Sequence, residues 1–166
     1  MTELFSEVQG DRREVWVRRA VVGVFAAIAA LALWGAIGQR ETEWTASGPS
    51  ARLLLAAPET VRGGIYFQSY VEIRATAAVE HPRLVLDDGW LEGMQVNSIE
   101  PAAESETSRD GRLVLSYGGL DPGDVLRIWM QFQVDPTSTG RRDYGLELDD
   151  EDRPLARIDR TIRVLP

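Results

Sequence analysis

The sequence predicts an all-β domain, built as a two-layer antiparallel β-sandwich and preceded by one apolar helix. An uninterrupted apolar run of 18 residues, 20–37, precedes the domain. Beyond residue 51, apolar and polar side chains alternate in many short segments. Turn sequences rich in Asp, Gly and Pro separate these segments. Strands with one apolar face, joined by short loops, pack as two antiparallel sheets around a shared core.

Charge divides the chain into two parts. Residues 1–40 hold five arginines and four acidic residues, whereas residues 41–166 hold thirteen arginines and twenty-two acidic residues, a net charge of −9. An acidic domain repels phosphate backbones, so no nucleic-acid partner is expected. There is no cysteine, which excludes disulfides, a thiolate nucleophile and a lipid-modified cysteine. The domain must be held together by its own core.

The apolar run predicts a transmembrane helix over residues 18–38. At about 1.5 Å per residue the 18 residues span roughly 27 Å, close to the hydrocarbon thickness of a bilayer. Arg18 and Arg19 flank the run on its N-terminal side, and Trp16 and Trp34 suit the two membrane interfaces. Positive charge stays on the cytoplasmic side. We therefore expect a cytoplasmic tail at residues 1–17 and an extracytoplasmic domain anchored in the cytoplasmic membrane.

Two processing alternatives compete with a permanent anchor. The small-x-small triplets at residues 27–29 and 30–32 fit a signal peptidase, but the apolar run exceeds the usual length of about 7–15 residues. Arg18-Arg19 also resembles a twin-arginine export signal, although the surrounding sequence lacks its polar residue. A permanent anchor is the stronger interpretation. Residues 39–50 are polar and end in Gly-Pro-Ser, which predicts a juxtamembrane linker before a domain at residues 51–166.

Alternation predicts the strands in chain order. The most regular is residues 125–134, in which Leu126, Ile128 and Met130 share one face with Phe132 and Val134. About seven to eight strands are expected, at residues 52–56, 65–75, 83–86, 94–99, 113–117, 125–134, 144–148 and 158–164. This pattern predicts an immunoglobulin-like sandwich. In the last segment Arg160 falls on the register of Ile158 and Ile162, which predicts either a bulge or an arginine reaching an acid at the sheet edge.

The turn motifs carry a resemblance. Residues 88–94 (DGWLEGM), 119–124 (GLDPGD) and 134–140 (VDPTSTG) follow the order of turns in prokaryotic cell-surface immunoglobulin-like domains of the CARDB-like and related repeat types. The resemblance covers about eighty residues, 84–166, and Glu92 replaces the proline of the first motif. It implies adhesion, spacing or protein contact outside the cell and supplies no catalytic residues.

The sequence offers few residues of the types that catalysis or metal binding requires. His81 is the single histidine, and no serine lies in a nucleophile motif, so no enzymatic activity, catalytic residue or cofactor is expected. Asp149, Asp150 and Asp152 are weak candidates for a calcium site. Their spacing fits a solvated hairpin tip better. Asp87 and Asp88 could also converge with Asp121 and Asp124 on a second acidic site.

Aromatic side chains on a polar strand face suggest a contact surface. Alternation places Trp129 with Arg127 and Gln131, and Tyr66 and Tyr70 on the outward face of their own strand. This composition is typical of protein interfaces. The alternative is that a loop or the linker around Trp44 covers Trp129.

Trp90 lies in a loop, where it fits either a sugar-stacking or interface residue or a plug over the end of the sandwich. The resulting hypothesis is a non-enzymatic single-pass protein that contacts another integral membrane protein as an accessory subunit. The alternative hypothesis is a cell-envelope module that binds glycan or calcium.

Overall fold

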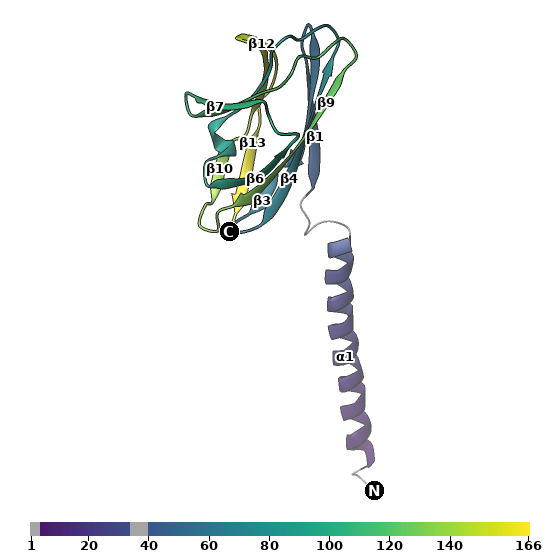
Figure 1. Ribbon diagram of the computed structural model, residues 1–166. Helices are drawn as coiled ribbons and strands as arrows, with labels where there is room; N and C mark the ends of the chain where they lie inside the picture. The colour runs from purple at the N-terminus through teal and green to yellow at the C-terminus, as the bar shows by residue number, and fades with distance from the viewer. Residues whose placement is uncertain (1–3, 34–39) are drawn as a thin grey trace. The chain divides into compact units, whose positions relative to one another are not determined.

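The computed structural model describes residues 4–33 and 40–166, with side chains placed for residues 14–31 and 40–166. The chain divides into two compact units, Met1–Gly38 and Gln39–Pro166. The first contains helix α1 (Leu4–Leu33), and the second contains every strand of the described chain (Figure 1).

Helix α1 presents its apolar side chains to the surroundings. All described side chains from residue 14 to residue 31 are exposed, including Trp16 at 70% and Phe25 at 68%. Within the described residues, no helix is both long enough and apolar enough to cross a bilayer. Residues 34–37 of the apolar run lie outside the described residues, and with them the predicted anchor Trp34.

The first layer of the domain is a five-stranded sheet, in the order β1-β2-β4-β9-β6. All of its neighbouring strands pair antiparallel. Its members are β1 (Glu41–Ser47), β2 (Ala51–Pro58), β4 (Tyr66–Ala75), β9 (Val125–Val134) and β6 (Met94–Glu100). The two ten-residue strands, β4 and β9, lie at its centre, where strict alternation gives each strand one buried and one outward face.

Eight strands form the other sheets. A five-stranded sheet runs in the order β12-β11-β5-β8-β7, and a three-stranded sheet in the order β10-β13-β3, in which β3 is parallel to β13. Two connections join these sheets, one from β10 to β11 and one from β12 to β13. The Tyr144 nitrogen, in the first connection, donates to the Arg160 carbonyl oxygen, in the second, at 2.8 Å. The strands are β3 (Thr60–Arg62), β5 (Pro82–Leu86), β7 (Ser105–Arg109), β8 (Arg112–Ser116), β10 (Gly140–Asp143), β11 (Leu146–Asp150), β12 (Arg153–Ile158) and β13 (Thr161–Leu165).

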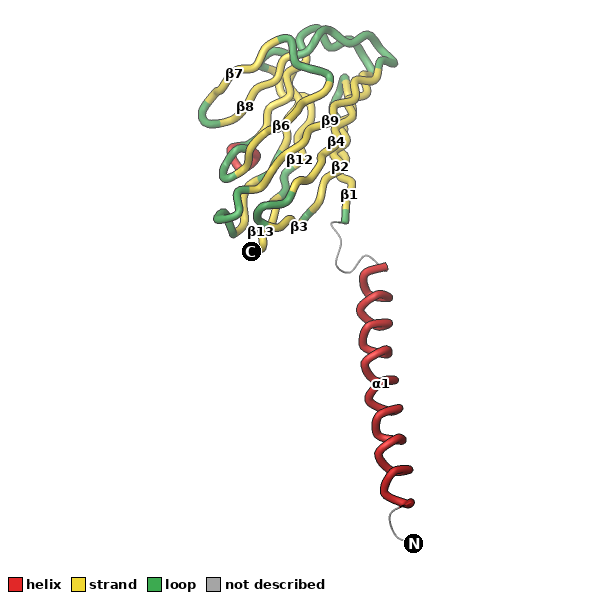
Figure 2. The backbone as a smooth tube through the Cα atoms, turned by 60° about the horizontal axis from the view of Figure 1, so that its bottom comes forward, coloured by secondary structure: helices red, strands yellow, loops and turns green. Residues whose placement is uncertain are grey.

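One hydrophobic core lies between the layers, whose strands are the yellow segments of the backbone in Figure 2. The core includes Leu53, Val71 and Ile128 of the first layer. It also includes Leu84 and Leu146 of the five-stranded sheet that contains β5 and β11, and all five side chains are fully buried. At one end the core is aromatic: Phe67, Phe132, Trp90 and Tyr144 form consecutive ring contacts. The prediction of an all-β sandwich is therefore confirmed.

The strand count and the domain boundary differ from expectation. The described chain has thirteen strands rather than seven to eight. Residues assigned to the linker form β1, because Thr42, Trp44 and Ala46 turn toward the domain while their neighbours face solvent. The segment predicted as a last strand at 158–164 is two strands, β12 and β13, which belong to different sheets.

The two alternatives offered for Arg160 are both wrong. Arg160 lies between β12 and β13, so no strand bulges around it. Its Nη2 donates to the carbonyl oxygen of Pro58 at 2.7 Å, and its guanidinium lies over the Trp44 ring. Its partners are thus a carbonyl and an aromatic face rather than an acid.

Candidate protein-contact surface

The antiparallel register of β4 and β9 builds a surface that we call the outer face. It consists of the outward residues Tyr66, Gln68, Tyr70, Glu72 and Arg74 of β4 and Arg127, Trp129, Gln131 and Gln133 of β9. The register sets Tyr70 opposite Trp129, and their ring centroids lie 5.3 Å apart at an interplanar angle of 49°. Trp129 is 42% exposed and Tyr66 62% exposed. All five predicted contact residues of these two strands share this face.

Glu72 fixes the charged half of the outer face. One carboxylate oxygen, Oε2, accepts from the Tyr70 hydroxyl at 2.8 Å and from Arg127 Nε at 3.2 Å. The other, Oε1, accepts from Arg74 at 3.0 Å. The Tyr70 hydrogen bond is the main cause that lowers the pKa of Glu72, and the two arginines act in the same direction. These side chains are therefore held in place before any partner arrives.

The Trp129 ring is open to solvent, which argues against the covering alternative. Trp44, the residue expected to cover it, instead lies on the inward register of β1 and packs against the core. The Arg160 guanidinium carbon sits 3.7 Å from the Trp44 ring centroid. An exposed tryptophan on an ordered, partly charged face is typical of a binding surface.

Trp90 is the one predicted contact residue that the structure removes from the surface. It is fully buried and stacks on Tyr144, with ring centroids 3.5 Å apart. Its Nε1 donates to the Gly145 carbonyl oxygen at 2.8 Å. The interface and sugar-stacking interpretations are therefore wrong, because the indole is committed to the core. The plug interpretation fits its position beside Phe132 and Tyr144 at the aromatic end of the core.

The three candidate calcium ligands bind arginines instead. Asp149 is 3% exposed, and its Oδ2 lies 3.5 Å from Arg109 Nη2. Asp150 contacts Arg153 at 3.1 Å, and Asp152 lies 3.3 Å from Arg109 Nη1. Residues 149–153 form the tip of the β11–β12 hairpin, as the turn interpretation expects. Each of these three carboxylates thus has an arginine partner.

His81 and the aspartates of the second predicted acidic site take part in turns and ion pairs. His81 is exposed and its backbone nitrogen donates to Asp150 at 2.9 Å. Asp87 pairs with Arg157 at 2.9 Å, whereas Asp124 accepts from the Asp121 nitrogen within its own turn. Across the described part of the chain, no three His, Asp or Glu side chains gather where they could hold a metal ion. The predicted convergence of these aspartates does not occur.

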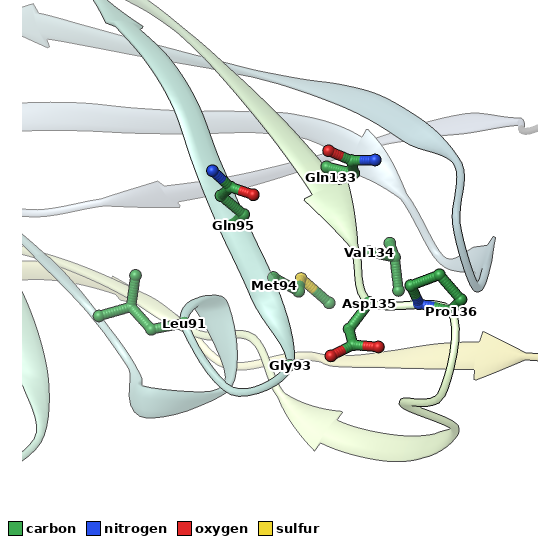
Figure 3. Close-up of a pocket in the computed structure, with 8 residues that line it drawn as sticks. All are labelled: Leu91, Gly93, Met94, Gln95, Gln133, Val134, Asp135 and Pro136. Atoms are coloured by element: carbon green, nitrogen blue, oxygen red, sulfur yellow. The ribbon is translucent and has the colours of Figure 1, made fainter.

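A pocket lies where β9 ends and β6 begins (Figure 3). It has a volume of ≈ 390 Å³. Its apolar lining comes from Leu91, Met94, Val134 and Pro136, and its polar groups are Gln95, Gln133, Asp135 and the backbone at Gly93. Gln95 and Gln133 are direct register partners, so the pocket continues the outer face toward its edge strand.

Sequence reasoning missed Glu72 and the three polar residues of this pocket. Glu72 was visible on the outward face of its strand, but its pairing with Arg127 depends on the register between strands 55 residues apart. Gln95, Gln133 and Asp135 carry no motif. Only the pairing of β6 with β9 brings them together.

The predicted membrane-anchor residues are partly described. Trp16, Arg18 and Arg19 lie in helix α1 with exposed side chains. Their positions agree with a helix that carries positive charge before its apolar run. Trp34 is outside the described residues.

Comparison with known proteins finds likeness at the level of structure. No protein-family model matches the chain, and no curated protein matches its sequence. The solution structure of a CARDB domain from Pyrococcus furiosus is similar at a TM-score of 0.43 and 12% identity, covering 67% of this chain and 90% of that one. A crystal structure of the same domain, in complex with di-metal ions, is similar at a TM-score of 0.42 and 12% identity. That match covers 72% of this chain and 92% of the other. Identity this low transfers neither residues nor activity.

Proposed function

We propose that this chain is a single-pass membrane protein, with its N-terminus in the cytoplasm, whose immunoglobulin-like domain contacts an integral membrane protein as an accessory subunit. The observation that carries the contact is the exposed Trp129, whose ring packs at a tilt against that of Tyr70 on a face ordered by Glu72. Aromatic and arginine side chains of this kind contribute most of the binding energy in protein interfaces. No enzymatic activity is part of the proposal.

The anchor is supported by the sequence of the apolar run and by the exposure of α1. Residues 20–37 carry no charge, and the described side chains of the run include exposed Val21, Val22, Val24, Phe25 and Ile28. Exposed valine and phenylalanine side chains around a helix are costly in water but favourable in lipid or against another helix. Arg18 and Arg19 before the run support a cytoplasmic N-terminus.

Co-purification with a matched pair of variants tests the contact. The full chain, extracted in mild detergent, is expected to elute with a second membrane protein. Trp129→Ala should abolish that co-elution, because it truncates the centre of the outer face. Glu106→Ala, at an exposed position of β7, is the control and should retain the partner. Equal recovery with both variants, or a lone wild-type monomer, contradicts the proposed contact.

Protease accessibility tests the topology separately. Protease added to cells stripped of their wall should digest the C-terminal domain and leave a membrane-protected N-terminal fragment. A domain protected until the membrane is disrupted would contradict the proposed orientation. This result is independent of whether the outer face has a partner.

A further inference from the structure

The pocket at the end of β9 combines two exposed apolar side chains with one negative charge held in place (Figure 3). Leu91 and Pro136 supply its exposed apolar surface, whereas Met94 and Val134 are buried in the core beneath it, and Asp135 supplies the carboxylate. The remaining polar side chains, Gln95 and Gln133, are neutral. Among the described residues that line the pocket none is basic, and the Arg142 guanidinium, which lies beside Gly93, contacts Ser138 and Glu92 instead.

Local bonds hold Asp135 in position. Its Oδ1 accepts from Thr137 N at 2.9 Å and from Thr137 Oγ1 at 2.8 Å. These two bonds lower the pKa of Asp135 below its ordinary value. The backbone is tied as well, because Asp135 N donates to the Gly93 carbonyl oxygen at 3.0 Å.

Asp135 differs from the ion-paired carboxylates elsewhere in the domain. Glu72, Asp87 and Asp149 each contact an arginine, as do Glu147 and Asp152. The two hydrogen bonds to Asp135 come from a neutral threonine. The pocket therefore offers a carboxylate whose charge no lining side chain neutralises.

We propose that this pocket binds a lysine or arginine side chain of a partner polypeptide. Such side chains have an apolar stem that can lie against Leu91 or Pro136 and a cationic head that can pair with Asp135. The net charge of −9 on residues 41–166 favours a basic partner surface for the same reason. The inference rests on the proposed contact through the outer face and names the chemistry of its partner.

The position of the pocket favours a polypeptide over a small free cation. Gln133 and Gln131 continue from the pocket along β9 to Trp129, four residues away, which spans roughly 13 Å of strand. Their carboxamides can donate to and accept from a peptide backbone. A segment of extended chain can therefore contact Trp129 and place a basic side chain in the pocket.

Peptide titration of the full chain in detergent tests this assignment. The probes are the capped tripeptides acetyl-Gly-Arg-Gly-amide, acetyl-Gly-Lys-Gly-amide and acetyl-Gly-Glu-Gly-amide, with choline as a non-peptide cation. Binding is followed by NMR shifts of the Gln95 and Gln133 side-chain amides. We expect shifts with the two basic peptides and none with the glutamate peptide.

Two aspartate variants provide the decisive comparison. Asp135→Asn keeps an acceptor for Thr137 and should weaken binding of the basic peptides about tenfold. Asp121→Asn is the matched control, since Asp121 also precedes a proline but lies before β9 rather than after it. It should leave binding unchanged.

Three results would overturn the assignment: no shift with any basic peptide, equal binding by Asp135→Asn, or tighter binding of choline than of the peptides. These failures are distinguishable from failure of the proposed function. Loss of co-elution in Trp129→Ala would still support contact through the outer face, with a partner that does not use the pocket.

Discussion

The guanidinium carbon of Arg160 lies 3.7 Å from the centroid of the Trp44 ring and 5.0 Å from that of Tyr144. Arg160 belongs to the break between β12 and β13, and its cation thus packs against Trp44 of β1 and against Tyr144. Burial lowers the pKa of Arg160, and its Nε and Nη1 find no hydrogen-bond partner within the described chain. Aromatic faces and the Pro58 carbonyl therefore hold this partly buried charge.

Removing Trp44 should destabilise the domain through this contact. Trp44→Ala is expected to lower the free energy of unfolding by about 2 kcal/mol, because it deletes a partly buried ring and one face of the cation–π pair. Trp44→Phe should recover part of the loss. Urea denaturation of the full chain in detergent, followed by tryptophan fluorescence, measures both. A double-mutant cycle with Arg160→Met should give a coupling of about 1 kcal/mol, and zero coupling would contradict the assigned pair.

The buried hydroxyl pair in the core makes a second prediction. Ser69 Oγ and the Tyr144 hydroxyl lie 3.0 Å apart. Tyr144→Phe should cost about 1–2 kcal/mol, because the Ser69 hydroxyl is left buried without its partner. Adding Ser69→Ala should return most of that loss. If the double variant proves less stable than Tyr144→Phe, the hydrogen bond is not the source of the effect.

Asp149 should make the domain less stable as pH rises. Burial, the largest cause, raises its pKa in the folded state above the ordinary value of 3.8, and the charge of Glu147 adds to this shift. Between these two pKa values the folded state binds more protons than the unfolded state, so stability falls as pH rises through that interval. Asp149→Asn should remove this fall and raise stability at neutral pH.

Melting temperatures recorded from pH 4 to pH 8 measure the effect. The matched control is Asp152→Asn, an exposed carboxylate in the same hairpin that shares the partner Arg109. It should keep the wild-type profile. Identical profiles for wild type and Asp149→Asn would show that the Asp149 carboxylate does not titrate as proposed.

The proposed anchor predicts a dependence on the apolar run. Ala27→Arg combined with Ala30→Arg should move the protein from the membrane pellet to the soluble fraction after carbonate extraction. Each arginine near the centre of a spanning helix costs about 2.5–3.5 kcal/mol of insertion. Replacing the same two alanines with leucine is the control, and this variant should stay in the pellet. Retention of the arginine variant would count against a spanning helix.

Alternation predicted the central strands because burial enforces it there. β9 begins and ends where the pattern does, and the inward residues Phe67, Val71 and Ile73 of β4 are buried as expected. Ile65 is the exception: it precedes β4 and is 43% exposed. The edge strands gave little signal, because β7 is exposed at every residue and β10 holds no apolar residue.

The remaining errors arise from contacts distant in sequence. The sequence left Trp90 open between an interface or sugar-stacking residue and a plug, because a loop aromatic gives no sign of the Tyr144 ring that stacks on it from 54 residues away. Ile158 and Ile162 are an even number of residues apart, so a single strand would place both on one face, and the sequence predicted one strand. In the structure Asp159 and Arg160 separate two strands there. Alternation within β4 and β9 was enough to predict that Tyr70 and Trp129 face outward. The contacts of Glu72 and the lining of the pocket depend on the register between strands, which the sequence does not show.

Photo-crosslinking in intact membranes tests the central claim most directly. A photoreactive phenylalanine derivative at position 129, on the outer face, should form a crosslink to a second membrane protein. The same group at position 107, an exposed site of β7 in the other layer, should not. A crosslink from 129 alone is the predicted result. Crosslinks of equal yield from both positions, or none from 129, would contradict contact through the outer face.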